Sequence, residues 1–341
     1  MKALVFDENK LLELREVEKP KIVNDTDVLL QIKATGICGT DIHILQKDYP
    51  AKKGIILGHE SSGVVEEVGS RVTNVKVGES VILDPTYHCE ICYYCQNNRP
   101  NYCAEKHHTE TGVSHDGTFA EYHVVNSSFL FPLPKGMTFE EGTLAEPLAC
   151  VLNALRQTRI VPESRVLVIG AGPIGLLFAT TTESMGCEVT IGDVDEYRIK
   201  NARELFSLVQ DYKKKDLLST NAQNKFDIIV DTSGKSLERV LQLIDRGGDV
   251  LVIGLDYSFE AKIKPSFLTD NGIRIIGSID SNRTFAPAIK LISQNKKFGK
   301  IITHTFPIDD YENAFGALGL NLKTLAREKI NGNKVVICPS K

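Results

Sequence analysis

The first 150 residues alternate apolar and polar side chains in short runs that are separated by turn-forming residues. Examples are residues 28–34, 63–69 and 80–84, with Gly, Asn, Asp and Pro between them. A period of two places every second side chain on one face, which is typical of half-buried strands. No convincing helical pattern of ten residues occurs in this part of the chain. The pattern therefore predicts a β-rich domain over residues 1–150.

From residue 151 the chain changes to alternating helical and strand-like segments. In order, these are helix 151–159, strand 166–169, helix 196–206, strand 226–231, helix 236–245, strand 249–255 and strand 273–279. This rhythm indicates a parallel, doubly wound sheet with helices on both faces. We expect a nucleotide-binding domain over 151–283 and a final segment, 284–341, that returns to the first domain.

Residues 166–193 combine a strand, a glycine turn, a helix and a second strand that ends at Asp193. Gly170, Gly172 and Gly175 have the G-x-G-x-x-G spacing, which permits a sharp turn, approach of a pyrophosphate and close packing of helix on strand. Asp193 follows Gly175 by 18 residues, where its carboxylate can accept hydrogen bonds from a ribose diol. We expect a dinucleotide site rather than a purely structural turn, and NAD rather than NADP, because Asp193 would repel a 2′-phosphate. The predicted cofactor-binding residues are Gly170, Gly172, Pro173, Ile174, Gly175, Asp193 and Arg198.

The composition is ordinary for a globular protein, with 42% hydrophobic and 25% charged residues and a formal net charge of −4. That charge argues against a nucleic-acid footprint, and no apolar run reaches the roughly 18 residues of a membrane span. The first ten residues lack the apolar core and cleavage site of a signal peptide. We therefore expect a cytoplasmic protein without nucleic-acid or membrane partners.

Four of the eight cysteines cluster in the pattern C-x2-C-x2-C-x7-C, at Cys89, Cys92, Cys95 and Cys103. Four thiolates at this spacing can complete a tetrahedron around zinc with no open position, so such a metal would be structural. The first three also fit the start of a ferredoxin motif, but that motif needs its fourth cysteine after three residues, followed by proline. Structural zinc is favoured over an iron–sulfur cluster or unliganded thiols, and the clustering favours a reducing compartment.

A second set of metal-ligand types is spread along the chain, at Cys38, His59, Glu60 and Glu146, with Cys150 as a further candidate. Each also has a structural interpretation: Cys38 as a small buried hydrophobe, His59 as a satisfied core histidine and Glu146 as a surface acid. Periodicity alone does not bring positions so far apart together.

The segment GHESSG (58–63), followed by Gly69 and Val72, resembles the zinc signature of the medium-chain alcohol dehydrogenase family. The segment GICGTDIHI (36–44), the four-cysteine cluster and GAGPIG (170–175) occur in the same order as in that family, so the resemblance covers essentially the whole chain. It implies an α/β protein in which a GroES-like, β-rich catalytic domain is interrupted by a Rossmann domain with a doubly wound parallel sheet.

The resemblance implies roles for the scattered residues. Cys38 and His59 resemble the catalytic zinc ligands, and Glu60 resembles the acid that joins or leaves the zinc. Glu146 stands where members that act on simple alcohols carry a cysteine, a departure similar to the polyol and threonine dehydrogenase branches. Whether Glu60 or Glu146 binds the zinc directly is left open.

The resemblance also implies a supporting set around the zinc. Asp41 resembles the carboxylate that orients His59. Thr40 and His43 resemble the hydroxyl-to-imidazole relay that carries the substrate proton to solvent. His107 and His108 follow the cysteine cluster, where a surface loop is favoured over a place in the active-site cleft.

These roles imply a zinc- and NAD-dependent dehydrogenase that interconverts the secondary alcohol of a polyol or sugar alcohol, phosphorylated or not, with its ketone. The alternative is L-threonine 3-dehydrogenase, because 36–44 is equally similar to that branch, whereas EPLACVLNAL (146–155) is closer to the polyol branch. A non-catalytic NAD-binding sensor is disfavoured because the ligand and relay positions are all intact. The resemblance also places the edge strand of the nucleotide domain, here 273–279, in a subunit contact, which implies a homodimer or homotetramer.

Overall fold

The computed structural model of the chain describes residues 1–7, 11–106, 110–213 and 225–340. The chain divides into two compact units, Met1–Ala149 with Ser281–Lys341, and Cys150–Asp280. The first boundary falls within helix α5 (Ala145–Leu155). The final segment therefore belongs to the same unit as the start of the chain. None of the helices in the described residues is long and apolar enough to cross a membrane.

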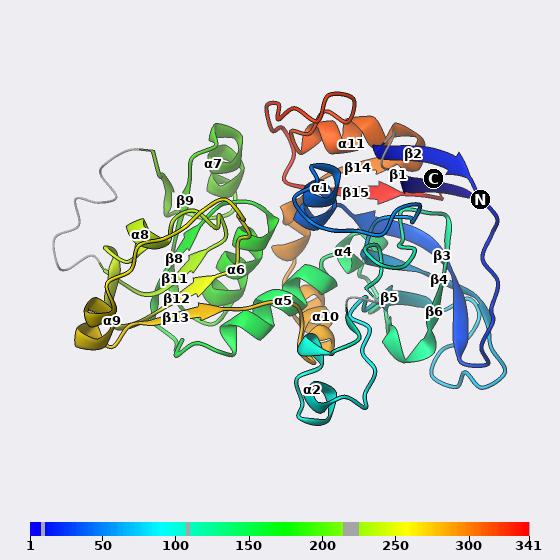
Figure 1. Ribbon diagram of the computed structural model, residues 1–341, viewed down its shortest axis with the longest axis horizontal. Helices are drawn as coiled ribbons and strands as arrows, with labels where there is room; N and C mark the ends of the chain where they lie inside the picture. The colour runs from blue at the N-terminus through cyan, green and yellow to red at the C-terminus, as the bar shows by residue number, and fades with distance from the viewer. Residues whose placement is uncertain (8–10, 107–109, 214–224, 341) are drawn as a thin grey trace. The chain divides into compact units, whose positions relative to one another are not determined.

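The first unit is built on a seven-stranded sheet in the order β14-β15-β3-β4-β5-β7, with β6 paired to β3. The strands are β3 (Asp27–Gly36), β4 (Glu60–Val68), β5 (Ser80–Leu83), β6 (Tyr122–Asn126), β7 (Leu130–Pro132), β14 (Ile302–Pro307) and β15 (Lys334–Cys338). A separate antiparallel pair joins β1 (Lys2–Asp7) to β2 (Leu11–Glu16). Figure 1 shows the red strand β15 among the blue elements from the start of the chain. The strands expected at 28–34, 63–69 and 80–84 are confirmed, apart from end residues.

Helices complete this unit. They are α1 (Gly39–Leu45), α2 (Tyr93–Gln96), α4 (Phe139–Gly142), α10 (Phe285–Gln294) and α11 (Tyr311–Ala317). Helices α1, α2 and α4 are short, in keeping with the lack of a ten-residue helical pattern in the first 150 residues. Phe315 of α11 packs edge-to-face on Phe119, with ring centroids 6.2 Å apart. Both rings are fully buried with Leu4, Leu57 and Ile337 in one hydrophobic cluster. The first and last parts of the chain therefore share a core.

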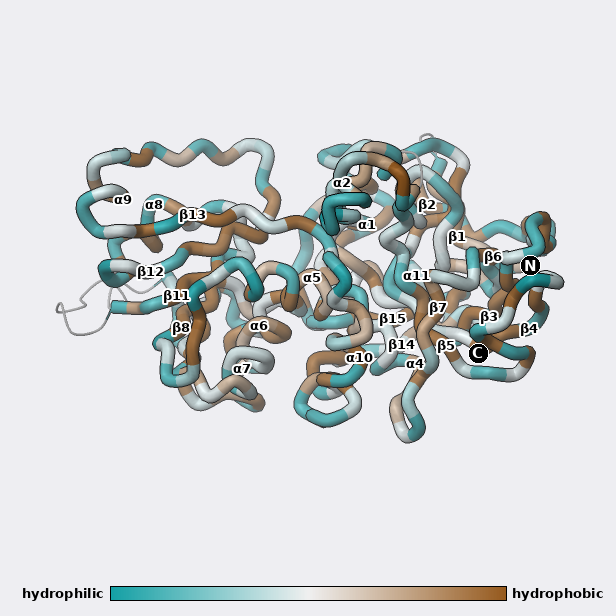
Figure 2. The backbone as a smooth tube through the Cα atoms, turned by 90° about the horizontal axis from the view of Figure 1, so that it is seen from below, coloured by the Kyte–Doolittle hydropathy of each residue, from teal (hydrophilic) through white to brown (hydrophobic). Residues whose placement is uncertain are grey.

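The second unit is a six-stranded sheet in the order β10-β9-β8-β11-β12-β13, in which every pairing is parallel. Its elements are β8 (Arg165–Ile169), α6 (Pro173–Ser184), β9 (Glu188–Asp193), α7 (Glu196–Arg203), β10 (Val209–Asp211), β11 (Phe226–Asp231), α8 (Leu237–Val240), β12 (Ile244–Val252), α9 (Pro265–Asn271) and β13 (Arg274–Gly277). The central strands carry buried apolar runs, residues 166–169 in β8 and 228–230 in β11, and Figure 2 shows brown segments in both. With β8 counted first, the order is 3-2-1-4-5-6 of a Rossmann fold, which confirms the predicted fold class.

Two expected helices differ from the structure, and one short strand was not expected. The helix at 236–245 is wrong beyond Val240, because Leu241 and Leu243 turn into the sheet core and β12 begins at Ile244. The helix expected at 151–159 begins earlier, at Ala145, and ends at Leu155. Strand β10 was not expected, since its three residues are too short to show a period.

A buried carboxylate joins two strands of the second unit to the loop before β8. Asp249 of β12 is fully buried and accepts hydrogen bonds from Arg159, through its backbone N–H and guanidinium, and from the guanidinium of Arg274 in β13. Burial alone would raise the pKa of Asp249, but the hydrogen bonds from Arg274 and Arg159 outweigh burial and lower the pKa to about 2. The ionised form is therefore the form that the fold stabilises.

We predict that Asp249→Asn lowers the free energy of unfolding by about 2–3 kcal/mol at pH 7, because hydrogen bonds to charged groups are each worth about 1.5–3 kcal/mol. The folded-state pKa lies below the unfolded value of about 3.9, so this stability is present above pH 4 and is lost as the pH falls toward 2. Urea unfolding at several pH values measures both effects. Glu312→Gln, which removes an exposed partner of Lys323, is the control and should change stability by less than about 0.5 kcal/mol. An Asp249→Asn effect that did not shrink in acid would contradict this account.

Candidate active site and metal centres

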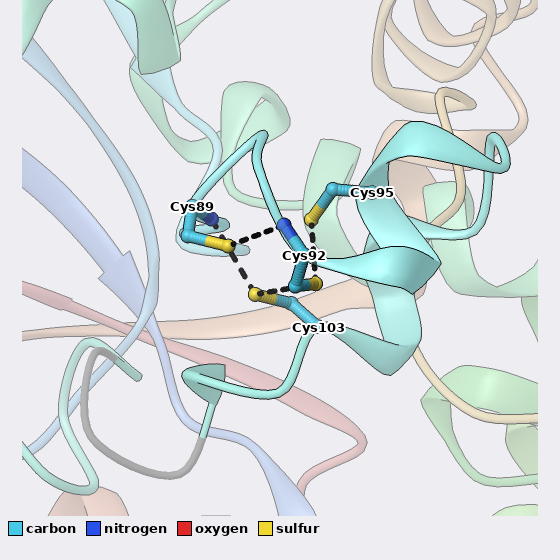
Figure 3. Close-up of side chains that lie close together, drawn as sticks. All are labelled: Cys89, Cys92, Cys95 and Cys103. Carbon is cyan, nitrogen blue, oxygen red and sulfur yellow. Dashed lines mark hydrogen bonds between the residues drawn. The ribbon is translucent and has the colours of Figure 1, made fainter.

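The four clustered cysteines converge on one point. Sulfur atoms of Cys89, Cys92, Cys95 and Cys103 all lie within 4.8 Å of one another. Figure 3 shows the four side chains directed inward, Cys89 and Cys92 from a loop, Cys95 from α2 and Cys103 from the segment that follows. The sulfur of Cys92 lies 3.5 Å from that of Cys95 and 4.0 Å from that of Cys103. None of the four forms a disulfide.

Backbone amides make this cluster suitable for a cation. The N–H groups of Cys89 and Cys92 donate to the sulfur atoms of Cys103 and Cys89, each at 3.4 Å. Hydrogen bonds from the backbone of Ala104 and Cys95 lower the pKa of Cys92 to about 6, whereas burial and the neighbouring thiols raise the pKa of Cys95 to about 12. Four converging sulfur ligands fit a tetrahedral zinc ion with no open position.

The second metal-ligand cluster lies beside the end of one strand and the start of its antiparallel neighbour. β3 and β4 are antiparallel, and Gly36 at the end of β3 lies opposite Glu60 at the start of β4. The chain then turns into α1 at Cys38, and His59 immediately precedes β4. Ligand atoms of Cys38, His59 and Glu60 consequently lie within 4.8 Å of one another. Sheet pairing, not sequence spacing, brings these residues together.

A tight turn fixes the direction of His59. Gly58 has φ +90°, and a Cβ there would meet the ring of Phe119 at 2.8 Å. Only glycine combines this left-handed backbone with so close an approach. The turn therefore explains the glycine of the GHE segment.

Polar atoms around His59 lack partners in the described part of the chain. Asp41 is fully buried, and its Oδ2 accepts a hydrogen bond from the backbone N–H of Cys38 at 2.8 Å. Its Oδ1 faces His59 Nδ1 at 4.0 Å, and neither atom has a hydrogen-bond partner. Burial raises the pKa of Asp41. Buried polar atoms without hydrogen-bond partners are rare, and this pair indicates that the Asp41 carboxylate is positioned to orient the ring of His59 as a metal ligand.

The charges in this cluster also suit a cation. Burial alone would lower the pKa of His59, but the charge of Cys38 and its hydrogen bond, followed by the charges of Asp41 and Glu146, raise the pKa well above its ordinary value. A divalent ion held by Cys38, His59 and a carboxylate would balance the surrounding negative charge, so the residues fit the catalytic zinc that the resemblance implies.

The relay residues lie on the same short helix. Thr40 and His43 are three residues apart on α1 and therefore share a face. The Thr40 hydroxyl lies 3.6 Å from the sulfur of Cys38, and His43 Nδ1 lies 3.8 Å from Asp48 Oδ2. Both side chains are partly exposed. The helix thus leads from the metal-ligand cluster toward solvent.

The structure distinguishes the remaining candidates. Glu146, on α5, acts on His59 through its charge but is not in the cluster of atoms within 4.8 Å. Cys150 falls in the second unit and joins neither cluster. His107 and His108 lie outside the described residues.

The surroundings of Gly170, Gly172 and Gly175 can be compared with the role expected for each glycine. Gly170 has φ +100°, and a Cβ there would lie 2.2 Å from the hydroxyl of Thr232. A Cβ at Gly175 would lie 1.8 Å from the carbonyl oxygen of Gly170, so no larger residue fits between helix and strand. Gly172 caps the start of α6, with Pro173 and Ile174 in its first turn, and a Cβ there would lie 3.7 Å from the guanidinium of Arg198.

Asp193 is attached more firmly to the turn than the sequence indicates. Its Oδ2 accepts from the backbone N–H of Ala171 at 2.6 Å, and its Oδ1 accepts from Val194 and Asp195 at 2.6 and 2.8 Å. The Nε of Arg198 is buried without a hydrogen-bond partner among the described residues, and the guanidinium lies 3.7 Å from where a Cβ of Gly172 would be. The turn therefore offers an anion both backbone N–H groups and a cation.

Two residues at the metal-ligand cluster were not identified from the sequence. Lys334 of β15 is buried and donates to Glu60, and Gly36 leaves the space in which the two side chains meet. A lysine that begins an otherwise apolar strand is a detectable signal, because a buried lysine requires a partner.

A Rossmann sheet with a glycine turn, together with two clusters of metal ligands, defines a metal-dependent, nucleotide-linked oxidoreductase. The family profile described as "Alcohol dehydrogenase GroES-like domain" matches residues 24–135, and the profile "Zinc-binding dehydrogenase" matches residues 173–294.

Individual relatives agree over nearly the whole chain. D-arabinitol dehydrogenase 1 of Uromyces fabae is 32% identical over 92% of this chain and 93% of its own length. Sorbitol dehydrogenase of Bombyx mori is 29% identical over 89% of this chain and 91% of its own. The crystal structure of galactitol-1-phosphate dehydrogenase from Escherichia coli superposes with a TM-score of 0.88 at 25% identity, over 99% of this chain and 100% of that one. The chain belongs to the zinc-containing medium-chain alcohol dehydrogenase family, which confirms the resemblance seen in the sequence.

We predict that Cys92→Ser lowers the metal content from about two zinc ions per chain to about one, because three sulfur atoms no longer close a tetrahedron. The melting temperature should fall by about 5–10 °C, since a structural metal is lost. Metal analysis and thermal unfolding measure these effects. Cys187→Ser is the matched control: Cys187 is buried, bonds to a backbone oxygen and lies in neither cluster, so the zinc content should not change. Full zinc content in Cys92→Ser would contradict the assignment.

Proposed function

We propose that this protein oxidises a secondary alcohol of a polyol or sugar alcohol to the ketone, with NAD as hydride acceptor, and catalyses the reverse reaction. The balance is alcohol plus NAD⁺ giving ketone, NADH and one proton. The observation that carries the proposal is the carboxylate-rich cluster of Cys38, His59 and Glu60, with Glu146 acting on it. The named relatives, which are polyol dehydrogenases, support this substrate class over L-threonine.

In this proposal Cys38 and His59 hold the catalytic zinc with carboxylate help from Glu60 and Glu146, and Asp41 orients His59. The bound zinc supplies a Lewis acid for the substrate oxygen, and NAD supplies the hydride acceptor. Thr40 accepts the substrate proton as it gives up its own, and His43 carries that proton onward to solvent. The 3.6 Å contact of Thr40 with Cys38 supports the start of this route.

The cofactor part of the proposal rests on the turn around Gly170, Gly172 and Gly175. The backbone N–H groups at the start of α6 and the guanidinium of Arg198 bind the pyrophosphate in this account. Asp193 retains a negative charge next to the ribose site, which favours NAD over NADP. The three hydrogen bonds that Asp193 accepts from the turn support a fixed position for this charge.

We also propose that the chain functions in the cytoplasm as a homodimer or homotetramer. The reduced cysteine quartet supports a reducing compartment, because thiolates must stay unpaired to hold zinc. The free edge of β13, the last strand of its sheet, supports a contact between copies of the chain.

We predict that the purified protein reduces NAD with a polyol and does so at least about tenfold less efficiently with NADP or with L-threonine. The measurement follows the absorbance of reduced nicotinamide with sorbitol, xylitol, ribitol, galactitol and their phosphates, each with zinc present. Greatest activity with L-threonine would overturn the assigned substrate class.

We predict that Glu146→Cys lowers kcat/KM for vicinal diols by about 10–100-fold more than for simple secondary alcohols. A carboxylate makes the metal harder and readier to add oxygen ligands, so a diol can chelate where a lone hydroxyl gains little. The ratio of kcat/KM for a polyol to that for 2-butanol measures the effect. Equal losses on both substrates would refute this explanation of Glu146. Glu140→Gln, at a glutamate of α4 that lies in neither metal cluster, is the control and should leave the ratio unchanged.

A further inference from the structure

The last strand of the chain brings a buried lysine to the catalytic metal cluster. Lys334 is 1% exposed, and its Nζ donates to Oε2 of Glu60 and, at 3.1 Å, to the backbone oxygen of Ile37. The Glu60 side chain is buried to the same degree. Either partner alone would be an unpaired charge away from water, so the two side chains hold each other in a fixed geometry.

The register of three strands explains how residues 60 and 334 meet. β3 lies between β4 and β15, and its Gly36 is opposite Glu60 on one side and Val336 on the other. Lys334 lies two residues before Val336 and therefore on the same face of β15, from which its side chain extends diagonally across Gly36.

Gly36 leaves the space for this contact. A Cβ at position 36 would lie 2.3 Å from Oε2 of Glu60 and 2.7 Å from Cε of Lys334. Distances below 3.0 Å do not occur for real Cβ atoms, so any larger residue would displace one of the two side chains. Glycine on the middle strand thus permits the ion pair that joins its two neighbours.

We propose that Lys334 is a positioning residue of the catalytic metal site that competes with the metal ion for Glu60. The proposal rests on the proposed function, in which the cluster of Cys38, His59 and Glu60 binds the catalytic zinc. Glu60 belongs to that cluster, yet its Oε2 is already engaged by an ammonium group. Two cations that attract one carboxylate weaken each other's hold on it.

This competition keeps Glu60 exchangeable. With Lys334 in place, the carboxylate has a second partner to which it returns, so a position on the metal stays available for the substrate hydroxyl. Without the lysine, a buried carboxylate has to turn to the metal, because leaving it unpaired is costly. The metal would then be held more tightly and the substrate position would be lost.

The test measures zinc release from the Lys334→Met variant, in which a chain of similar length carries no charge. A chromogenic chelator in excess removes zinc from the folded, fully loaded protein, and release from the cysteine quartet is the internal standard. We expect release from the catalytic site to slow by about tenfold or more, kcat to fall by a similar factor, and release from the quartet to stay unchanged. In cobalt-loaded protein the visible absorption should weaken, as the coordination number rises.

Three further variants separate positioning from a merely structural role. Lys334→Arg keeps a cation and should release zinc at a rate within about threefold of the parent. Gly36→Ala keeps both charges but separates them, so it should slow release as Lys334→Met does. Combining Glu60→Gln with Lys334→Met removes the freed carboxylate and should restore fast release.

Unchanged or faster release of catalytic zinc from folded Lys334→Met overturns the proposal, because a lysine that only neutralises a buried charge would give that result. If Lys334→Met does not fold, unchanged release from Gly36→Ala overturns it equally. Failure of the proposed function is recognised separately with Cys38→Ala: if this variant still holds about two zinc ions per chain, the metal site itself is wrongly assigned.

Discussion

The first unit depends on a concentration of buried negative charge that only a cation can balance. Asp41 and Glu60 are almost completely inaccessible to water, and the thiol of Cys38 adjoins His59. Removing carboxylates from water is costly unless each finds a cation or several donors. Lys334 supplies one cation. A divalent metal at Cys38, His59 and Glu60 would supply another, so metal binding would also stabilise this part of the fold.

The two metal-ligand clusters are built on different length scales. The cysteine quartet is contained in 15 residues, and turns and backbone amides of that segment position its sulfur atoms. The cluster of Cys38, His59 and Glu60 exists only when β3 and β4 are paired, and its lysine is 274 residues away from Glu60 along the chain. Closing the short loop of the cysteine quartet costs little conformational entropy, whereas the cluster of Cys38, His59 and Glu60 forms only once the strands of the sheet have paired. The catalytic cluster is therefore the one that responds to changes far away in the sequence.

This difference also decides what the sequence could predict. The glycine turn and the quartet are local patterns, so their residues were identifiable before the structure was known. The Rossmann sheet followed from the alternation of segments and is confirmed, although β10 was too short to detect and the buried Leu241 and Leu243 resembled the continuation of a helix. Lys334 could have been noticed as a lysine at the start of an apolar strand, but its partner Glu60 and the role of Gly36 depend on cross-strand register, which no spacing along one chain displays.

Asp193 also has a structural role that the glycine-rich motif does not reveal. Its position at the end of β9 favours a ribose as partner, yet three backbone N–H groups already donate to its carboxylate. A carboxylate accepts about four hydrogen bonds in total, so one position remains for a ligand. The charge that we propose selects the cofactor thus also holds the glycine turn in shape. The turn and its selectivity are consequently linked, because a change at Asp193 that admits a 2′-phosphate also releases the N–H of Ala171 next to the pyrophosphate site.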